Sequence, residues 1–155
     1  MKVYHDQDAQ RVKIFDERFY TLDGENYYPS VTTILEAYPK PFLNEWFKSV
    51  GMNADIIRDK AAMIGSYVHD AIERIIAGNE VRFEEGHFQE WVMICKFMEF
   101  YDAHVEEVLA CEYKLVHDGM KLGGTIDLVC KIEGEVWIID FKTCDSLNVT
   151  NEVQQ

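Results

Sequence analysis

Residues 123–143 read GGTIDLVCKIEGEVWIIDFKT, two apolar runs joined by an acidic residue and a glycine at 133–134. Such runs around a short turn predict a β-hairpin. The hairpin brings Asp127 beside Asp140, and Lys142 shares the face of Asp140 because alternate side chains of a strand point the same way. Two carboxylates and an ammonium are costly to bury unless a cation or ligand joins them. This stretch therefore predicts a functional site.

The composition is that of a folded domain of ordinary size. The chain has 155 residues, of which 48% are apolar and 13% aromatic, enough to bury a sizeable core within a single domain. It contains no run of 18 apolar residues, and its first residues lack the apolar centre of a signal peptide. We therefore expect a soluble, cytoplasmic protein with no membrane partner.

The net charge of −13 argues against a broad nucleic-acid surface, because phosphate binding draws on an excess of Lys and Arg. Part of this acidity is explained if some carboxylates are metal ligands, and an enzyme that holds a few phosphates needs only local positive charge. The cations available for a local patch are Lys40, Lys48, Arg58, Lys60, Arg74 and Lys121. For any single one, the simpler interpretation is a solvated surface cation.

The order of the elements is helices first and strands afterwards. Apolar spacing and stop signals predict helices at residues 31–37, 43–50, 53–77 and 88–109, after a peripheral hairpin within residues 1–27. A three-stranded antiparallel meander follows, at residues 111–117, 122–132 and 135–143. This order predicts an α+β or mixed α/β domain in which helices flank one central sheet.

His69 lies four residues after Gly65 and four before Glu73, so the three share one face of a predicted helix. The glycine allows this face to approach a strand closely, which would bring the imidazole to the sheet. A helical histidine is more often a packing or capping residue than a ligand. The two aspartates on the predicted hairpin favour the ligand.

The chain carries three motifs in a fixed order: Gly65-x-x-x-His69, then Gly124-Thr125-Ile126-Asp127, then Ile139-Asp140-Phe141-Lys142-Thr143. Together they resemble the RecB-type branch of the PD-(D/E)XK nuclease superfamily. Residues 28–35, YPSVTTIL, are similar to the phage-encoded and mitochondrial genome maintenance exonuclease members of that branch. The resemblance covers roughly residue 28 to the end and implies a restriction-endonuclease-like core.

The resemblance also implies a role for each matched residue. Asp127 and Asp140 would bind Mg²⁺ or Mn²⁺, and Lys142 would be the catalytic lysine. His69 and the backbone carbonyl of Phe141 would complete the metal site. Weaker candidates, for an outer role, are Glu73 and Glu112. An iron–sulfur cluster occurs within this branch, but the four cysteines here lack its spacing, so we expect none.

Members of this branch usually carry a Q-x-x-x-Y motif on the helix after the lysine strand, where it contacts substrate. The sequence ends in NEVQQ, where Gln154 or Gln155 is a candidate for the first residue of that motif. We therefore expect a domain truncated at its C-terminus, without the flanking helix. An uncovered sheet edge would favour a homo-oligomer or lower the stability.

The helix that begins at Ser30 allows two interpretations. Ser30, Thr32 and Thr33 would either bind a phosphate of DNA or only cap the helix. Aromatic side chains near this helix are candidates for stacking on unpaired bases or for packing, namely Tyr27, Tyr28, Tyr38, Phe42, Trp46 and Phe47. For Trp46 and Phe47, core packing is the preferred interpretation.

These residues predict a metal-dependent deoxyribonuclease, and the resemblance implies an exonuclease with single-stranded DNA or duplex ends as its partner. Carboxylates suit Mg²⁺, an added imidazole suits Mn²⁺, and a lysine is able to orient the attacking water. The phage-like resemblance implies a bacterial or phage role in recombination, repair or replication. The alternatives are a non-catalytic nucleic-acid or protein-binding module on a nuclease scaffold and a phosphohydrolase of nucleotides.

Overall fold

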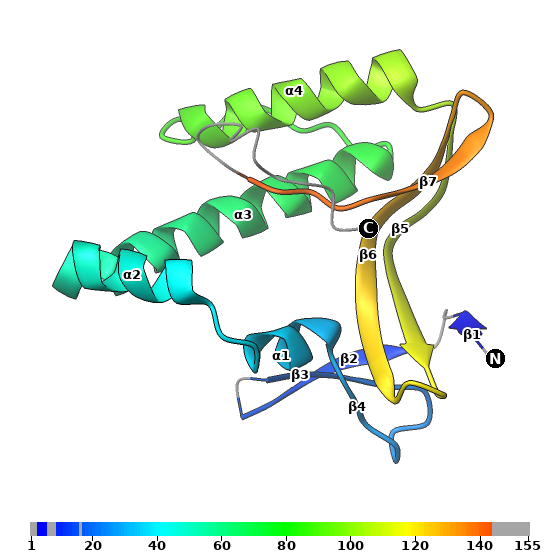
Figure 1. Cartoon of the computed structure of the whole chain (residues 1–155). Coiled ribbons are helices and arrows are strands. Elements are labelled where there is room, and N and C mark those ends of the chain that lie inside the picture. Colours follow the sequence, from blue (N-terminus) through cyan, green and yellow to red (C-terminus); the bar gives the residue numbers. More distant parts are fainter. Residues whose placement is uncertain (1–2, 6–8, 16, 144–155) are drawn as a thin grey trace.

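The computed structural model describes residues 3–5, 9–15 and 17–143. Within them two antiparallel sheets are formed, one in the order β1-β5-β6-β7 and one in the order β2-β3-β4 (Figure 1). The first sheet consists of β1 (Val3–His5), β5 (Glu107–His117), β6 (Leu122–Ile132) and β7 (Glu135–Ile139). The second consists of β2 (Gln10–Ile14), β3 (Glu17–Thr21) and β4 (Tyr28–Pro29). With its helices the chain is an α+β protein, but the prediction of one central sheet was wrong.

The helices are α1 (Val31–Glu36), α2 (Pro41–Val50), α3 (Ala54–Ile76) and α4 (Phe88–His104), with a 3₁₀ turn at Gly51–Asn53 between α2 and α3. Long strands β5 and β6 connect the two ends of the molecule. The helices α3 and α4 lie beside one end, and α1 with the second sheet lies at the other (Figure 1). None of the helices in the described part of the chain is both long and apolar enough to cross a membrane.

The meander β5-β6-β7 confirms the predicted strands, with changed ends. Strand β6 has the predicted bounds, and the turn into β7 uses positive φ angles at Glu133 and Gly134, as a tight hairpin requires. Helix α4 ends at His104 rather than at 109, and β5 begins at Glu107. Val105 already has extended φ and ψ angles. Its β-branched side chain suits a strand as well as an apolar helix face, which explains the error.

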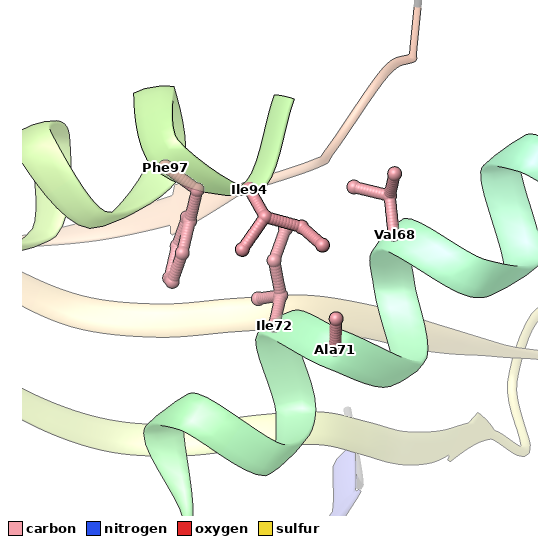
Figure 2. Close-up of a cluster of buried hydrophobic side chains, with 5 residues drawn as sticks. All are labelled: Val68, Ala71, Ile72, Ile94 and Phe97. Atoms are coloured by element: carbon pink, nitrogen blue, oxygen red, sulfur yellow. The ribbon is translucent and has the colours of Figure 1, made fainter. Parts of the chain in front are cut away.

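The main core lies between α3 and α4, where apolar side chains at helical spacing face each other. Val68, Ala71 and Ile72 of α3 pack against Ile94 and Phe97 of α4 (Figure 2). Phe141, beyond β7, adds its ring edge-on to Phe97, with the ring centroids 5.4 Å apart. Val68 and Ile72 are therefore buried at the centre of α3, whereas Ile57 near its start is exposed.

The N-terminal hairpin is less peripheral than expected, because β3 packs directly on β6. Tyr20 is buried, and its ring covers Gly123, where an added Cβ would lie 2.7 Å from Tyr20 Cβ. The Tyr20 hydroxyl and Thr125 Oγ1 are 2.8 Å apart, within a hydrogen bond. Two positions of the GGTID stretch therefore have a structural role in joining the sheets.

Helix α1 begins where the sequence predicts. The Ser30 hydroxyl accepts a hydrogen bond from the Thr33 backbone N–H at 2.9 Å, which caps the helix. Ser30 also forms an isolated bridge with Gly123, so the start of α1 is fixed to β6. The next helix, α2, ends at Gly51, whose φ of 66° suits glycine.

Candidate metal site

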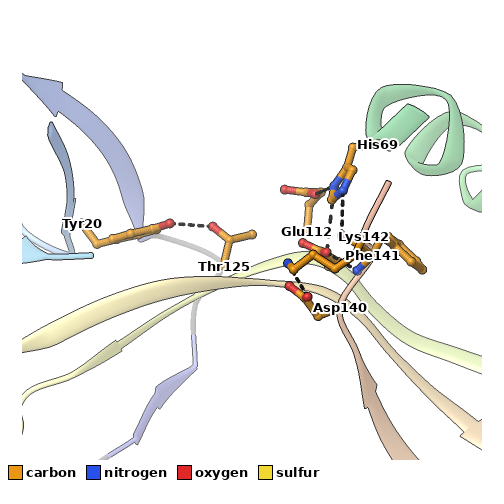
Figure 3. A network of polar contacts seen from close by, with 8 residues as sticks. Tyr20, His69, Glu112, Thr125, Asp140, Phe141 and Lys142 are labelled. Atoms are coloured by element: carbon orange, nitrogen blue, oxygen red, sulfur yellow. Dashed lines mark hydrogen bonds and ion pairs between the residues drawn. The ribbon is translucent and has the colours of Figure 1, made fainter. Parts of the chain in front are cut away.

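Three elements each contribute one side chain to a candidate metal-binding group (Figure 3). Helix α3 supplies His69, β5 supplies Glu112, and β6 supplies Asp127. The register that pairs Cys111 with Leu128 puts Glu112 opposite Asp127 across the β5-β6 ladder. Directly opposed residues of an antiparallel pair have their side chains on one face. The two carboxylates therefore meet on the sheet, and α3 brings the imidazole to them.

The separations of His69 from the two carboxylates are compatible with a single cation. One ligand atom of each residue lies within 4.8 Å of the other two. His69 Nδ1 is 4.0 Å from Glu112 Oε1 and 3.9 Å from Asp127 Oδ2. Both separations are too long for a hydrogen bond, but two ligands that each hold a cation at about 2.1 Å lie at most about 4.2 Å apart. Two carboxylates and an imidazole are a donor set for Mg²⁺ or Mn²⁺.

The orientation of His69 also suits a ligand. Its Nε2 lies 3.2 Å from the carbonyl oxygen of Phe141, which accepts, so Nε2 carries the proton. In the neutral ring Nδ1 then has the lone pair, and it is Nδ1 that faces the two carboxylates. A metal-ligating histidine commonly donates its other N–H to a carbonyl in this way. The Phe141 carbonyl, predicted as a metal ligand, accepts this hydrogen bond.

Negative charge accumulates around Glu112. Burial raises the pKa of the Glu112 carboxyl, and the charges of Asp127 and Glu73 raise it further, while His69 opposes them. Burial, with the charge of Glu112 next, also raises the pKa of the Cys111 thiol to about 11, so this thiol is protonated at neutral pH. A cation bound between the carboxylates would offset the repulsion between them.

The backbone is distorted at Glu112. Its φ of 47° lies in the left-handed region, although it stands within strand β5. Residues other than glycine seldom adopt this region, and the cost is of order 1–3 kcal/mol. The surrounding sheet therefore enforces the conformation of this carboxylate residue, as is common for residues that line binding sites.

Asp140 and Lys142 lie just beyond the end of β7. They form an ion pair with each other, although the strand on which a shared face was predicted for them ends at Ile139. Their side chains are 65% and 77% exposed, respectively. Asp140 does not belong to the group of ligating residues found in the described part of the chain, whereas Glu112 does.

The early end of β7 explains the position of Asp140. The β6-β7 ladder stops at the pair Leu128 and Ile139, and one further pair would put Asp140 opposite Asp127. Instead the Phe141 backbone N–H donates to Asp127 Oδ2 at 2.7 Å. The prediction of a strand through residue 143 was therefore wrong, because a side-chain acceptor replaces the backbone ladder.

Two other residues on α3 that the sequence singled out, Gly65 and Glu73, lie near the segment after β7 and near Glu112, respectively. An added Cβ at Gly65 would lie 3.4 Å from Thr143 Oγ1, so α3 does approach the segment after β7 closely at this glycine. Glu73 is exposed but near enough to raise the pKa of Glu112. It remains an outer residue of the site.

Two of the three polar residues at the start of α1, Ser30 and Thr33, form hydrogen bonds within the protein. Ser30 is buried and caps α1, and its hydroxyl lies 3.0 Å from the hydroxyl of Thr33. Thr32 is exposed. The predicted substrate contacts Gln154 and Gln155 lie outside the described residues.

Sequence reasoning ranked Glu112 too low, although the sequence contained a signal. A four-residue turn at positions 118–121 makes His117 face Leu122, and counting back along both strands puts Glu112 opposite Asp127. The distortion at Glu112 has no comparable signature in the sequence.

Searches against protein-family models, curated proteins and solved structures found no match to this chain.

Proposed function

We propose that this protein is a divalent-cation-dependent deoxyribonuclease with a restriction-endonuclease-like core. The observation that carries the proposal is the convergence of His69, Glu112 and Asp127 within 4.8 Å, next to the segment that holds Asp140 and Lys142. The order of these residues along the chain supports it too, because it is the order expected from the resemblance to RecB-type nucleases. Carboxylates that hold a cation, together with an imidazole and an ammonium, are groups that promote phosphodiester hydrolysis.

Each side chain has a task in this proposal. His69, Glu112 and Asp127 would hold the cation, and the hydrogen bond from His69 to Phe141 would fix the imidazole for that purpose. A bound Mg²⁺ or Mn²⁺ would supply positive charge that offsets the charge developing on the phosphoryl oxygens. Lys142 would orient the attacking water or neutralise developing charge, since its exposed side chain is able to reach a substrate phosphate.

Asp140 would act together with Lys142. Their ion pair holds the ammonium near the end of β7. Asp140 stands one ladder step beyond the last β6-β7 pair, so a small extension of β7 would bring its carboxylate next to Asp127. In the proposed function, Asp140 joins the cation ligands by that extension.

Cleavage of end-labelled DNA in Mg²⁺ or Mn²⁺ tests the proposal. Single-stranded and duplex oligonucleotides are compared for the wild type, Asp127→Asn and Lys142→Met. We expect each substitution to lower the cleavage rate by about 100-fold or more. Matched controls on the exposed face of α4 are Asp102→Asn and Lys96→Met, which should cleave normally. Cleavage that survives in Asp127→Asn would refute the assignment.

One observation favours a second candidate, a metal-binding module without catalytic activity. Asp140 and Lys142 neutralise each other in solvent rather than contacting the three ligating residues. Titration calorimetry with Mn²⁺ separates the two functions when it is combined with the cleavage assay. Mn²⁺ binding that depends on Asp127, without cleavage of any DNA, would support the module.

A further inference from the structure

The connection between α1 and α2 exposes two aromatic rings around a lysine. The segment reads Tyr38-Pro39-Lys40-Pro41-Phe42, and the side chains of Tyr38 and Phe42 are 66% and 86% exposed. Rings of this size usually lose most of their surface to the core, because each contributes a large apolar area. The rings are therefore available to a partner.

The two prolines restrict the backbone that holds these rings. Proline fixes its own φ near −65° and also limits the residue before it, so four consecutive residues from 38 to 41 have little freedom. Pro41 forms the first turn of α2, where it is well tolerated. A partner that binds this segment would consequently pay little conformational entropy to order it.

The segment carries local positive charge on an acidic protein. The chain has a net charge of −13, yet it carries no acidic residue between Glu36 and Glu45, where Lys40 is exposed. A cation between two exposed rings matches a strand that alternates flat bases with phosphates.

The segment also connects the elements that build the candidate metal site. Before it, α1 is fixed to Gly123 of β6, the strand that carries Asp127. After it, α2 leads through Gly51–Asn53 into α3, which carries His69. In Figure 1 the segment runs between α1 and α2 on the side of the molecule where α3 and β6 diverge.

We infer that Tyr38, Lys40 and Phe42 form a binding surface for single-stranded nucleic acid, with the rings stacking on bases and the lysine on a phosphate. The inference rests on the proposed nuclease function and names its substrate class. Bases in a duplex are stacked on each other and hide their faces, whereas unpaired bases expose them. The surface therefore selects single strands over duplexes.

Fluorescence anisotropy tests the inference with two labelled probes, an oligothymidine and a duplex of equal length. The buffer contains Ca²⁺, and the probes are checked for cleavage after each measurement. Base stacking on one ring is worth roughly 5- to 150-fold in affinity, so Tyr38→Ala and Phe42→Ala should each weaken oligothymidine binding within that range. Tyr38→Trp, which keeps an aromatic ring at this position, should bind oligothymidine like the wild type. Lys40→Gln should lower the slope of log affinity against log salt by about 0.7.

The matched control is Phe88→Ala, which removes an equally exposed ring at the start of α4. It should leave binding unchanged, and circular dichroism should show all variants folded because each replaced side chain lies at the surface. The inference is overturned if the Tyr38→Ala/Phe42→Ala protein binds like the wild type, if Phe88→Ala is equally weak, or if the wild type does not prefer the single strand. An unchanged affinity would indicate a protein partner for these rings.

The two proposals fail in different ways. If the aromatic variants lose binding and no protein cleaves DNA in any metal, the binding surface is supported and the nuclease function is refuted. If the wild type cleaves DNA and the aromatic variants bind normally, the nuclease function is supported and the binding surface is refuted.

Discussion

Gly123 and Gly124 are adjacent in the sequence but have different surroundings. A Cβ at Gly123 would lie 2.7 Å from Tyr20 Cβ, inside the contact limit, whereas a Cβ at Gly124 would make an ordinary contact of 3.8 Å with Val31 Cγ2. We predict that Gly123→Ala lowers the free energy of unfolding by about 1–3 kcal/mol, the usual cost of overpacking. Urea denaturation measures it.

Gly124→Ala is the matched control for this prediction. It adds the same methyl group to the same strand, and alanine is less costly than glycine to order in a strand. Its free energy of unfolding should equal or exceed that of the wild type. Equal destabilisation by both substitutions would show that close contact with Tyr20 is not what limits the size of residue 123.

Asp23 organises the turn before β4. Its Oδ1 accepts hydrogen bonds from the backbone N–H groups of Asn26 and Glu25. The bond from the Asn26 backbone is the largest cause that holds the pKa of the Asp23 carboxyl well below its ordinary value of 3.8. The ionised form therefore stabilises the fold at pH values above 3.8, and this contribution is lost as the pH falls through and below that value.

We predict that Asp23→Ala is less stable than the wild type at pH 6, and that the difference shrinks as the pH is lowered toward 3. Urea midpoints measured across this range check it. Glu25→Gln, which keeps its backbone N–H, should show no such pH-dependent difference. A constant difference between wild type and Asp23→Ala would contradict the role of the ionised carboxylate.

At the scale of single residues, the sequence was informative where strand register decides the position. The hairpin around Glu133 and Gly134 formed as predicted, with Leu128 paired to Ile139. The ion pair of Asp140 and Lys142 lies beyond β7, so strand alternation does not explain it. The place of Asp140 relative to Asp127 did not follow, because a hydrogen bond from Phe141 N–H to the Asp127 side chain ends the ladder. Contacts of this kind depend on three-dimensional packing that no periodicity encodes.

Among the elements, the packing of α3 on α4 depends on a few fully buried side chains. Ile94 of α4 is 0% exposed and belongs to the same core cluster as Val68 and Ile72. We predict that Ile94→Ala lowers the free energy of unfolding by about 2–5 kcal/mol through lost burial and a residual cavity. Chemical denaturation followed by circular dichroism measures this loss.

Val92 provides the comparison on the same helix, since its side chain is partly exposed. Val92→Ala should change the free energy of unfolding by less than about 1 kcal/mol, because alanine regains helix propensity while little burial is lost. If Val92→Ala were as costly as Ile94→Ala, the assigned buried face of α4 would be wrong.

The boundaries of elements were predicted well only where a breaker residue stands. Gly51 and Gly78, both with positive φ, end α2 and α3 at the places expected from the sequence. Between α4 and β5 no such residue occurs, and the apolar residues from 105 to 109 satisfy both a helical and a strand pattern. Pairing with β6 decides the outcome: Val108 and Leu109 belong to β5, and Val105 belongs to the connection before it. The local sequence carries no signal for this pairing.

Strand β7 is the outer strand of its sheet, and in the described chain nothing pairs with its free edge. Its residues Val136, Trp137 and Ile138 are exposed. An apolar edge of this kind promotes association of chains. We predict that Val136→Lys reduces concentration-dependent association in sedimentation velocity, whereas Met120→Lys, at an exposed turn, has no effect. Equal behaviour of both variants would exclude this edge as the contact.

On the scale of the whole molecule, negative charge and fold stability are connected through the candidate metal site. A net charge of −13 destabilises a compact state by self-repulsion, and Glu112 with Asp127 concentrates part of this charge in one partly buried place. A cation bound there would offset local repulsion and join α3, β5 and β6. Metal binding should therefore stabilise the entire fold and not only the site.

We predict that Mn²⁺ raises the melting temperature of the wild type. At a concentration 100 times the dissociation constant, binding to the folded state alone adds about 2.7 kcal/mol, which corresponds to a shift of about 5–10 °C for a chain of this size. His69→Ala and Asp127→Asn should lose most of the shift, because each removes a ligand. His104→Ala, at the exposed end of α4, should keep it. Differential scanning fluorimetry with and without EDTA measures these shifts. A shift in Asp127→Asn as large as that of the wild type would show that the cation binds elsewhere.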